Sequence, residues 1–440
     1  MQTNNPKTFL LIDGAYFANR TLHGERIVNP EMTMHTNHDF MRFEYLMIRN
    51  LISTISAFKN DSTDIIDNVI LTFDSKSWRY GVDPHVPYYS EPGDKLKYKE
   101  NRDAQKEKSD IDWDAFKQAQ DDFAAMIKDF IPTYKISGFE ADDLLFYLTD
   151  KLSSDGHKCI VLATDGDLEQ LVNDRVVFFK DVRSKMSPNG ELYMSENNYN
   201  LLFSGQMGAG QTKTMLEMFT DKLSKSDEQI SVDLEMANWL GQLNQIQTTG
   251  NIYKKITRLP GQQTFIERKH KIMFYKCIEG DKKDNILPLL QWKSSTGTRN
   301  YKCTDKFISK VIASLGYSDS PETYKHLFDV ENLDFQFMIK AFMLNLVEQC
   351  KQMSVAKNLL AHLKHNMKLN LLSHDYLPES LRQDFQEEFD YLALQEPFDI
   401  KSFEIELMKK NVGVAGGESS SNTTNILTDS LPNVANILKL

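Results

Sequence analysis

The sequence lacks the features that mark secreted, membrane and zinc-binding proteins. Its four cysteines include no CxxC pair, which fits a reducing cytoplasm better than a disulfide framework or a zinc site. No stretch approaches the roughly 18 consecutive apolar residues of a membrane span. The first residues, MQTNNPKTF, have no signal-peptide pattern. We therefore expect a soluble, cytoplasmic protein with no membrane partner.

Several active-site motifs are missing as well. The chain has no GxSxG, no HExxH and no cysteine–histidine pattern. Residues 205–212 (GQMGAGQT) would fit a phosphate-binding loop, but Gln211 stands where that loop needs a lysine, which argues against nucleotide binding. The two histidines of HLKH (362–365) have no supporting carboxylate, so we expect them on a solvated helix face.

What the chain does have is a set of aspartates in similarly built segments. In FLLIDG, VILTFDS, GFEADDLL and VLATDGDLEQL, an apolar run adjoins a carboxylate at a strand end or a helix start. Such runs deliver their polar ends to one edge of a sheet, where the carboxylates would repel one another without divalent cations between them. With the later segment EGDKKDNI, the set is Asp13, Asp74, Asp142, Asp165, Asp167, Asp281 and Asp284.

Each carboxylate alone has a simpler explanation. Glu140, Asp142 and Asp143 would occupy the first turn of a helix, where the helix dipole favours negative charge. Asp13 and Asp74 could be turn residues. Independent caps have no reason to recur at every strand end of one edge, so we favour a shared Mg²⁺ site. Two such ions about 4 Å apart can activate water for phosphodiester hydrolysis.

The charge pattern is compatible with a nucleic-acid substrate, although the net charge of −11 by itself is not. Residues 95–108 carry six basic residues in fourteen, and a second basic stretch surrounds Asp281 and Asp284. An acidic, metal-binding cleft between two basic segments suits a phosphodiester. The predicted DNA-binding residues are Lys95, Lys97, Lys99, Arg102, Lys282 and Lys283.

The order of elements indicates an α/β fold with a mostly parallel sheet. Short apolar runs predict strands, longer amphipathic runs predict helices, and the two alternate. The expected strands are 8–12, 68–73, 158–163 and 175–179; the expected helices are 40–58, 112–130, 139–154 and a short one from Gly166. Residues 81–110 contain three prolines and then many charges, so we expect a loop or an exposed, mobile segment with no part in the core.

The rest of the chain divides into three further parts. We expect residues 1–190 to form the α/β core and residues 191–262, which are polar and hard to place, to form an insertion. Residues 263–412 are expected to be helical, at 264–278, 304–315, 334–368 and 379–392. Residues 413–440 have linker composition and end in an apolar peptide, which is either disordered or a docking peptide.

The ordered segments LIDG, TFDS, YKENRD, GFEADDLL, TDGDLEQL and EGDKKDNI resemble the flap endonuclease/5′→3′ exonuclease superfamily, over roughly residues 8–185 and 265–410. The resemblance implies a PIN-like core joined to a helix–three-turn–helix element that grips duplex DNA. It also implies a 5′ nuclease that removes RNA primers or flaps during replication, with residues 81–110 as its helical arch or the disordered equivalent of one. Asp167 and Asp281 are 114 residues apart, more than is usual in this superfamily.

The resemblance also assigns roles to residues. The first Mg²⁺ would lie among Asp13, Asp74, Asp142 and Asp165, and the second among Asp167, Asp281 and Asp284, with Mn²⁺ as a substitute. Glu140 and Asp143 would lie outside the ligand shell. Lys99 and Arg102 would contact the scissile phosphate, unless they only form a solvated charged face. After Asp284 the sequence NILPLLQWKSSTG lacks the glycine-rich hairpin of many relatives, so no potassium site is predicted.

The implied partners are duplex DNA with a 5′ flap or an RNA primer, and a single-stranded-DNA-binding protein or sliding clamp at the helical region or tail. Two other functions stay open. A PIN-type ribonuclease would act on single-stranded RNA, whereas GDKKDN and its basic surroundings favour a duplex. A non-catalytic DNA-binding scaffold would be built on a decayed nuclease, whereas the complete aspartate set argues against decay, because clustered carboxylates destabilise a fold.

Overall fold

A computed structural model of the chain describes residues 6–60, 63–64, 66–83, 97–180, 191–193, 276–294, 297–300, 353–355 and 359–389, with Met273 and a few residues between 309 and 323. Of the predicted insertion, only Glu191–Tyr193 are described. The rest of it, the predicted tail and the expected helix–three-turn–helix element as a whole lie outside these ranges, so the domain boundaries stay predictions.

The core is a six-stranded sheet in the order β5-β4-β1-β6-β7-β8. Its strands are β1 (Thr8–Asp13), β4 (Asn68–Thr72), β5 (Thr133–Tyr134), β6 (Lys158–Ala163), β7 (Val176–Lys180) and β8 (Glu191–Tyr193). The first five in this order run parallel, and β8 is antiparallel to β7. Every residue of β1, β4 and β6 is buried, as expected for strands covered on both faces. The predicted α/β class and mostly parallel sheet are confirmed.

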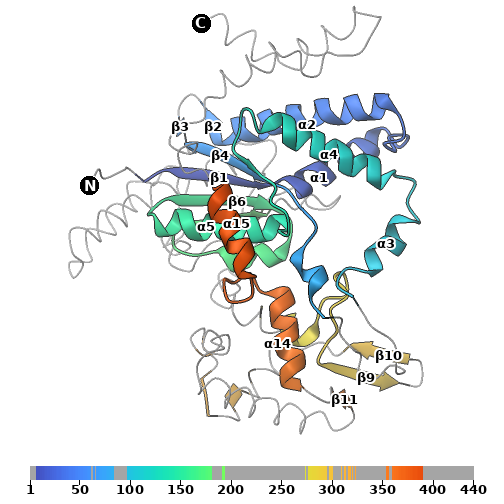
Figure 1. Ribbon diagram of the computed structural model, residues 1–440, viewed down its shortest axis with the longest axis vertical. Coiled ribbons are helices and arrows are strands. Elements are labelled where there is room, and N and C mark those ends of the chain that lie inside the picture. The colour runs from blue at the N-terminus through green and yellow to red at the C-terminus, as the bar shows by residue number, and fades with distance from the viewer. Residues whose placement is uncertain are drawn as a thin grey trace, which may run out of the picture.

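Helices cover both faces of this sheet (Figure 1). On one face lie α1 (Gly14–Val28), α2 (Asn37–Phe58) and α4 (Trp113–Ile127), and on the other lies α5 (Ala141–Ser154). The C-terminal α15 (Glu379–Glu388) packs beside α5, where the Phe385 and Tyr147 rings lie 4.9 Å apart. Shorter pieces are β2 (Lys59–Asn60), β3 (Thr63–Asp64), and the 3-10 helices η1 (Trp78–Gly81) and η2 (Gly166–Leu171).

The expectation for residues 81–110 was wrong in two respects. Residues Asn101–Lys106 form a helix, α3, and Tyr98 is buried against Ile286 and Leu369. The prolines and charges correctly excluded a strand of the sheet. They could not show that one aromatic residue among them packs against a partner far away in sequence.

The helical expectation for residues 263–412 also needs correction. Strands β9 (Leu290–Ser294), β10 (Gly297–Asn300) and β11 (Met353–Val355) form a three-stranded antiparallel sheet. Because β11 lies inside 334–368, that range is not one helix, and only its last part forms α14 (Leu359–Asn370). Pairing of β11 with β9 joins residues about sixty positions apart, which helical periodicity cannot reveal.

The prediction that the histidines of HLKH (362–365) lie on a solvated helix face was wrong, because this face of α14 is packed against other residues. His362 is 1% exposed, and its Nε2 lies 3.2 Å from the Leu287 carbonyl oxygen. Nearby, the Asn366 side chain donates to the carbonyl oxygens of Cys277 and Leu287, both at 2.8 Å. This polar face of α14 therefore binds the backbone of the segment that carries Asp281 and Asp284.

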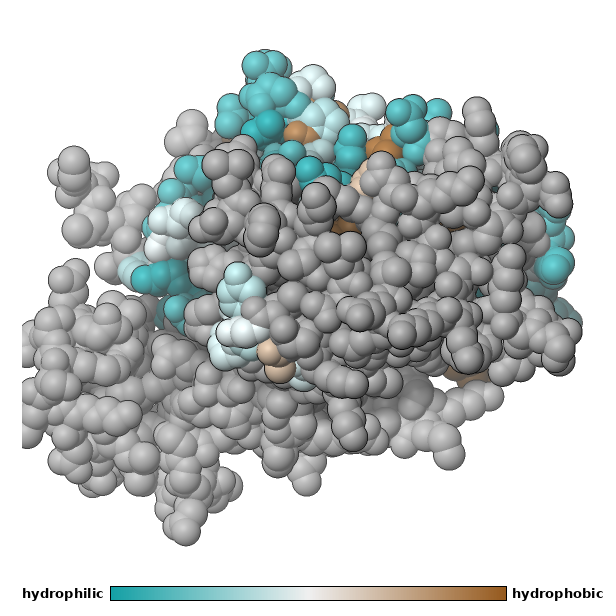
Figure 2. All heavy atoms as spheres, turned by 90° about the horizontal axis from the view of Figure 1, so that it is seen from below, coloured by the Kyte–Doolittle hydropathy of each residue, from teal (hydrophilic) through white to brown (hydrophobic). Residues whose placement is uncertain are grey.

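Seen from below, the described residues at the surface are mostly hydrophilic, with a few apolar side chains between them (Figure 2). Among the described residues, no helix is long and apolar enough to cross a membrane.

Candidate metal centre

Three adjacent strands bring carboxylates to the same edge of the sheet. Asp13 ends β1, Asp165 follows the end of β6, and Asp74 lies two residues beyond β4. The carboxyl ends of parallel strands are where α/β sheets carry their sites. Asp142, in the first turn of α5, lies at the same edge of the sheet, next to these three carboxylates.

These carboxylates do cap helices, as the simpler explanation required. Asp13 Oδ1 accepts from the Tyr16 N–H at 2.9 Å, and Asp165 Oδ1 accepts from the Asp167 N–H at 3.1 Å. Asp74 Oδ1 accepts from the Ala141 N–H at 2.7 Å and so ties β4 to the start of α5. Each cap uses one carboxylate oxygen. Capping and cleft lining are therefore compatible, and the caps hold the side chains in place.

Six of the seven aspartates line one cavity of about 110 Å³. Asp281 is the exception. The lining residues are Asp13, Asp74, Arg79, Tyr98, Lys99, Arg102, Glu140, Asp142, Asp165, Asp167, Asp284, Leu369, Asn370 and Leu372. The cavity therefore combines the α/β core, the start of α3, the Asp281–Asp284 loop and the end of α14.

The electrostatics of the deepest carboxylates are unfavourable. Burial, followed by the charges of Asp74 and Asp165, raises the pKa of Asp13 to about 7. Burial, followed by the charges of Asp165 and Asp13, raises the pKa of Asp142 well above its usual value. Burial also raises the pKa of Asp74. Within the described part of the chain, Asp13, Asp74, Asp142 and Asp165 form no ion pair, so a bound cation would relieve their repulsion.

The other three aspartates are already paired with cationic side chains. Lys276 contacts Asp167 and Asp281, and Arg102 contacts Asp284. Although burial opposes it, Lys276 holds the pKa of Asp281 below its usual value. The aspartates thus form two groups, a first group (Asp13, Asp74, Asp142 and Asp165) without ion pairs and a second with them, although burial and the charge of Asp165 still raise the pKa of Asp167 to about 6.

The donor set suits a hard divalent cation, because it consists of carboxylate oxygens that are partly buried and mutually repelling. The carboxylates are not closed around an ion, however. Among the described residues, no three carboxylate, imidazole or thiol groups are drawn together tightly enough to enclose one. We conclude that the residues fit a metal in chemistry, and that binding would draw them together.

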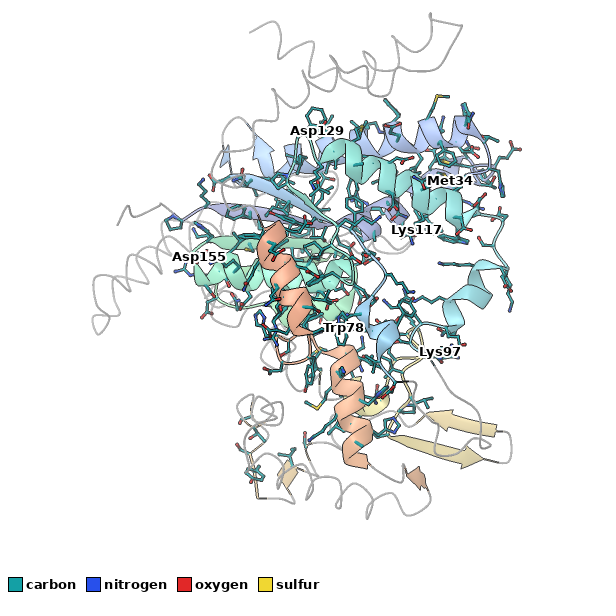
Figure 3. All side chains as sticks on the ribbon, in the orientation of Figure 1. Met34, Trp78, Lys97, Lys117, Asp129 and Asp155 are labelled. Atoms are coloured by element: carbon teal, nitrogen blue, oxygen red, sulfur yellow. The ribbon has the colours of Figure 1, made fainter. Side chains whose placement is uncertain are left out.

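The basic segment that begins at Lys97 is attached to the Asp281–Asp284 loop. The Lys99 N–H donates to the Asp284 carbonyl at 2.9 Å, the Asn101 side chain to the Lys282 carbonyl at 2.8 Å, and the Asn285 side chain to the Lys97 carbonyl at 2.9 Å. Figure 3 shows Lys97 beside α3 and this loop. Residues 97–102 and 281–286 therefore form one docked unit at the rim of the cavity.

The predicted phosphate-contacting and DNA-binding residues are placed around this unit. Lys99 contacts Glu140, and Arg102 contacts Asp284, so both lie at the cavity. The residues Lys97, Lys282 and Lys283 are exposed on the two segments. Lys95 lies outside the described residues.

Sequence reasoning missed Arg79 and did not single out Lys276. Arg79 is 2% exposed; it bonds Asp143 twice, at 2.7 and 2.8 Å, Glu140 at 3.2 Å and the Leu369 carbonyl at 3.1 Å. Asp143 therefore does not face the cavity but holds Arg79, while Glu140 does both. A lone arginine between Trp78 and Tyr80 was the only signal in the sequence.

Gly280 is required by the shape of the Asp281–Asp284 loop. Its φ is +69°, and a Cβ there would lie 2.6 Å from the Leu287 carbonyl carbon. We expect Gly280→Ala to lower the free energy of unfolding in urea by about 2 kcal/mol or more. Gly156→Ala is the matched control, because its φ is +89° but its surroundings are open. Equal losses in the two variants would show that close packing at Gly280 contributes nothing.

A comparison with known families agrees with this geometry. Residues 8–199 match the model of the 5′-3′ exonuclease N-terminal, resolvase-like domain. The N-terminal part of the chain therefore carries a domain of the 5′-3′ exonuclease superfamily. The superfamily expected from the motifs is confirmed for this domain, and the match spans every strand of the six-stranded sheet.

Individual relatives are more distant. Ribonuclease H of Enterobacteria phage T4 is 34% identical over 76 residues, which are 17% of this chain and 25% of that protein. The match thus spans a quarter of this relative's length. A bacteriophage T5 protein co-crystallised with metal ions is 15% identical over 92% of this chain and 99% of its own, with a TM-score of 0.42. The T5 flap endonuclease complex with DNA and metal ions is 15% identical over 92% and 98%, with a TM-score of 0.39.

Proposed function

We propose that the protein is a Mg²⁺-dependent 5′→3′ exonuclease and flap endonuclease that hydrolyses phosphodiester bonds at the 5′ ends of RNA primers or DNA flaps on duplex DNA. One observation carries the proposal most directly. Asp13, Asp74 and Asp165 leave three adjacent strands at one edge and meet Asp142 at a shared cavity, and none of the four is in an ion pair within the described structure.

In this proposal Asp13, Asp74, Asp142 and Asp165 hold the first ion, and Asp167, Asp281 and Asp284 hold the second. The ions, when bound, activate a water and stabilise the leaving oxygen. The protein's own part is to fix the carboxylates. The backbone N–H groups of Tyr16, Ala141 and Asp167 anchor one oxygen each of three first-group aspartates.

Lys99 and Arg102 would neutralise charge on the reacting phosphate. Both already lie at the cavity against Glu140 and Asp284, so a phosphate would compete with these carboxylates for them. The exposed Lys97, Lys282 and Lys283 on the docked unit, together with Lys95, would bind phosphates of the DNA backbone and make affinity salt-dependent.

The protein would act in replication, in the cytoplasm, on duplexes with a 5′ flap or RNA primer. A single-stranded-DNA-binding protein or a sliding clamp would be a further partner of the helical region or tail. Mn²⁺ would be able to substitute for Mg²⁺ in the reaction.

A cleavage assay tests the function. A 5′-labelled flap duplex and an RNA-primed duplex, each with 10-fold excess protein and either Mg²⁺ or EDTA, should yield short labelled products only with Mg²⁺ (on the order of 10 s⁻¹ or below at saturation). Unstructured RNA of the same length is the control substrate. Equal cleavage of that RNA would indicate a single-strand ribonuclease. Binding of the flap without any cleavage would indicate a scaffold.

Metal binding should stabilise the protein more at high pH than at low pH. The pKa of Asp13 is raised from 3.8 to about 7, so the folded state binds a proton that the unfolded state releases. Without metal, this group therefore loses stability as pH rises from about 4 through about 7. A cation at the site replaces that proton and restores the lost stability.

The measurement is the melting temperature between pH 5.5 and 8, with Mg²⁺ and with EDTA. At a metal concentration of 100 times Kd, the expected stabilisation is about 2.7 kcal/mol, or several degrees, at pH 8. It should shrink towards pH 5.5, where the proton competes with the ion. K⁺ at the same ionic strength is the control. An increment that does not depend on pH would contradict the assignment of Asp13 to the metal.

A further inference from the structure

Lys276 bridges two parts of the site that are distant in sequence. Its ammonium contacts both carboxylate oxygens of Asp167, on η2 of the core, and lies 3.1 Å from Asp281 Oδ2 on the loop. The Lys276 side chain is 20% exposed, and the two carboxylates are similarly enclosed, at 24% and 19%. The contact is therefore an enclosed three-group cluster and not a loose surface ion pair.

The ammonium occupies this place as a divalent ion would. It carries positive charge between the two carboxylates and uses both Asp167 oxygens. An ion bound to the same oxygens would meet the ammonium within a few ångströms, where like charges repel strongly in a partly buried site. The lysine and an ion cannot both hold Asp167 and Asp281 in this arrangement.

The first group of aspartates has no such internal cation. Asp13, Asp74, Asp142 and Asp165 face the cavity with no ion pair among the residues that the structure describes. A first ion arriving there displaces nothing and relieves repulsion. A second ion near Asp167 must first separate an existing ion pair.

We propose that Lys276 occupies the second metal position until that ion arrives, so that the two ions bind in a fixed order with unequal affinity. The inference rests on the proposed function, because it takes Asp167 and Asp281 as ligands of the second ion. It adds that this chain supplies a displaceable positive charge of its own, which keeps the core and the loop joined when metal is scarce.

The test measures Mn²⁺ binding to the full-length protein through the loss of the free-ion signal in electron paramagnetic resonance. Wild-type protein should bind two ions, the second at least about tenfold more weakly. Lys276→Met should bind the second ion about tenfold more tightly than wild type, which corresponds to about 1.4 kcal/mol. Lys117→Met is the matched control, because Lys117 is an exposed lysine on α4, well away from the loop (Figure 3). It should behave as wild type.

The sign of the change decides the inference. If Lys276 instead supports the ligands, Lys276→Met will bind the second ion equally well or more weakly, and the inference is overturned. A second measurement uses unaltered protein, in case the variant does not fold. Acylation of Lys276, quantified by mass spectrometry, should accelerate several-fold as Mn²⁺ fills the weaker site, while Lys117 stays unchanged. Constant or slower acylation of Lys276 would also overturn it.

The outcomes separate this inference from the proposed function. Flap cleavage by the wild-type protein is measured in parallel with Mn²⁺. Two bound ions without cleavage would refute the nuclease function alone. Cleavage with no gain in second-site affinity for Lys276→Met would refute the role of Lys276 alone. If neither protein binds Mn²⁺, both proposals fail.

Discussion

Asp142→Asn is expected to abolish cleavage of the flap substrate and also to raise the melting temperature of the metal-free protein. The same property causes both effects. Burial and the nearby charges of Asp165 and Asp13 raise the pKa of Asp142 well above its usual value. The carboxylate is therefore costly to the metal-free fold, and an amide of the same shape removes that cost. The substitution also removes one of the ligands that we propose for the first ion.

We expect the turnover number to fall by about a thousandfold or more, because losing a bound ion removes several kcal/mol of transition-state stabilisation. The melting temperature in EDTA should rise by about 3 °C, and the added stabilisation by Mg²⁺ should largely disappear. Asp155→Asn, at the other end of the same helix, is the control and should change neither value. A variant that loses activity and is also less stable without metal would show that Asp142 serves the fold.

Arg79→Met should be among the most destabilising single substitutions in the core. The guanidinium is buried and neutralises Asp143 and Glu140, and it also donates to the carbonyl of Leu369 in α14. Burial opposes the charge of Arg79, and its pKa is nevertheless raised, chiefly by Asp143 and Glu140. Removing one partner of such a buried pair typically costs about 3–5 kcal/mol, because the other charge is left without compensation.

Urea unfolding of Arg79→Met measures this loss directly. Adding Asp143→Leu to the same protein should recover at least half of it, since no uncompensated charge then remains at that position. Arg42→Met, which breaks a more exposed pair with Glu25, should cost less than about 1 kcal/mol. Failure of the second substitution to restore stability would show that Arg79 acts mainly through α14.

The strands that carry the site could be predicted from the sequence because their signal is local. The run 158–163 coincides with β6, and 68–73 differs from β4 by one residue. Helix α1 was not predicted, because its fifteen residues include Gly14 and Gly24 and many polar side chains, and it begins directly at Asp13. Its stability comes from packing of residues such as Phe17 and Leu22 against the sheet.

The residues of the site also divide into those that the sequence could predict and those that it could not. Carboxylates at strand ends follow from the sheet edge, so the convergence of Asp13, Asp74 and Asp165 was predictable. Arg79 contacts Asp143, Lys276 contacts Asp167, and His362 contacts Leu287, and the two residues of each pair lie at least sixty positions apart in sequence. Charge and periodicity give no information on such contacts, and a polar residue that binds a buried backbone carbonyl looks like a solvated one.

The docked unit of residues 97–102 and 281–286 has a consequence for the length of the chain between the core and the loop. The hydrogen bonds from Lys99 and Asn101 to Asp284 and Lys282 hold the Asp281–Asp284 loop directly at the cavity. The entropic free-energy cost of closing a flexible loop grows only with the logarithm of its length, by about 0.6 kcal/mol for each doubling. Residues added between the two halves of the centre therefore cost little, and the geometry of the carboxylates does not depend on how many separate Asp167 from Asp281.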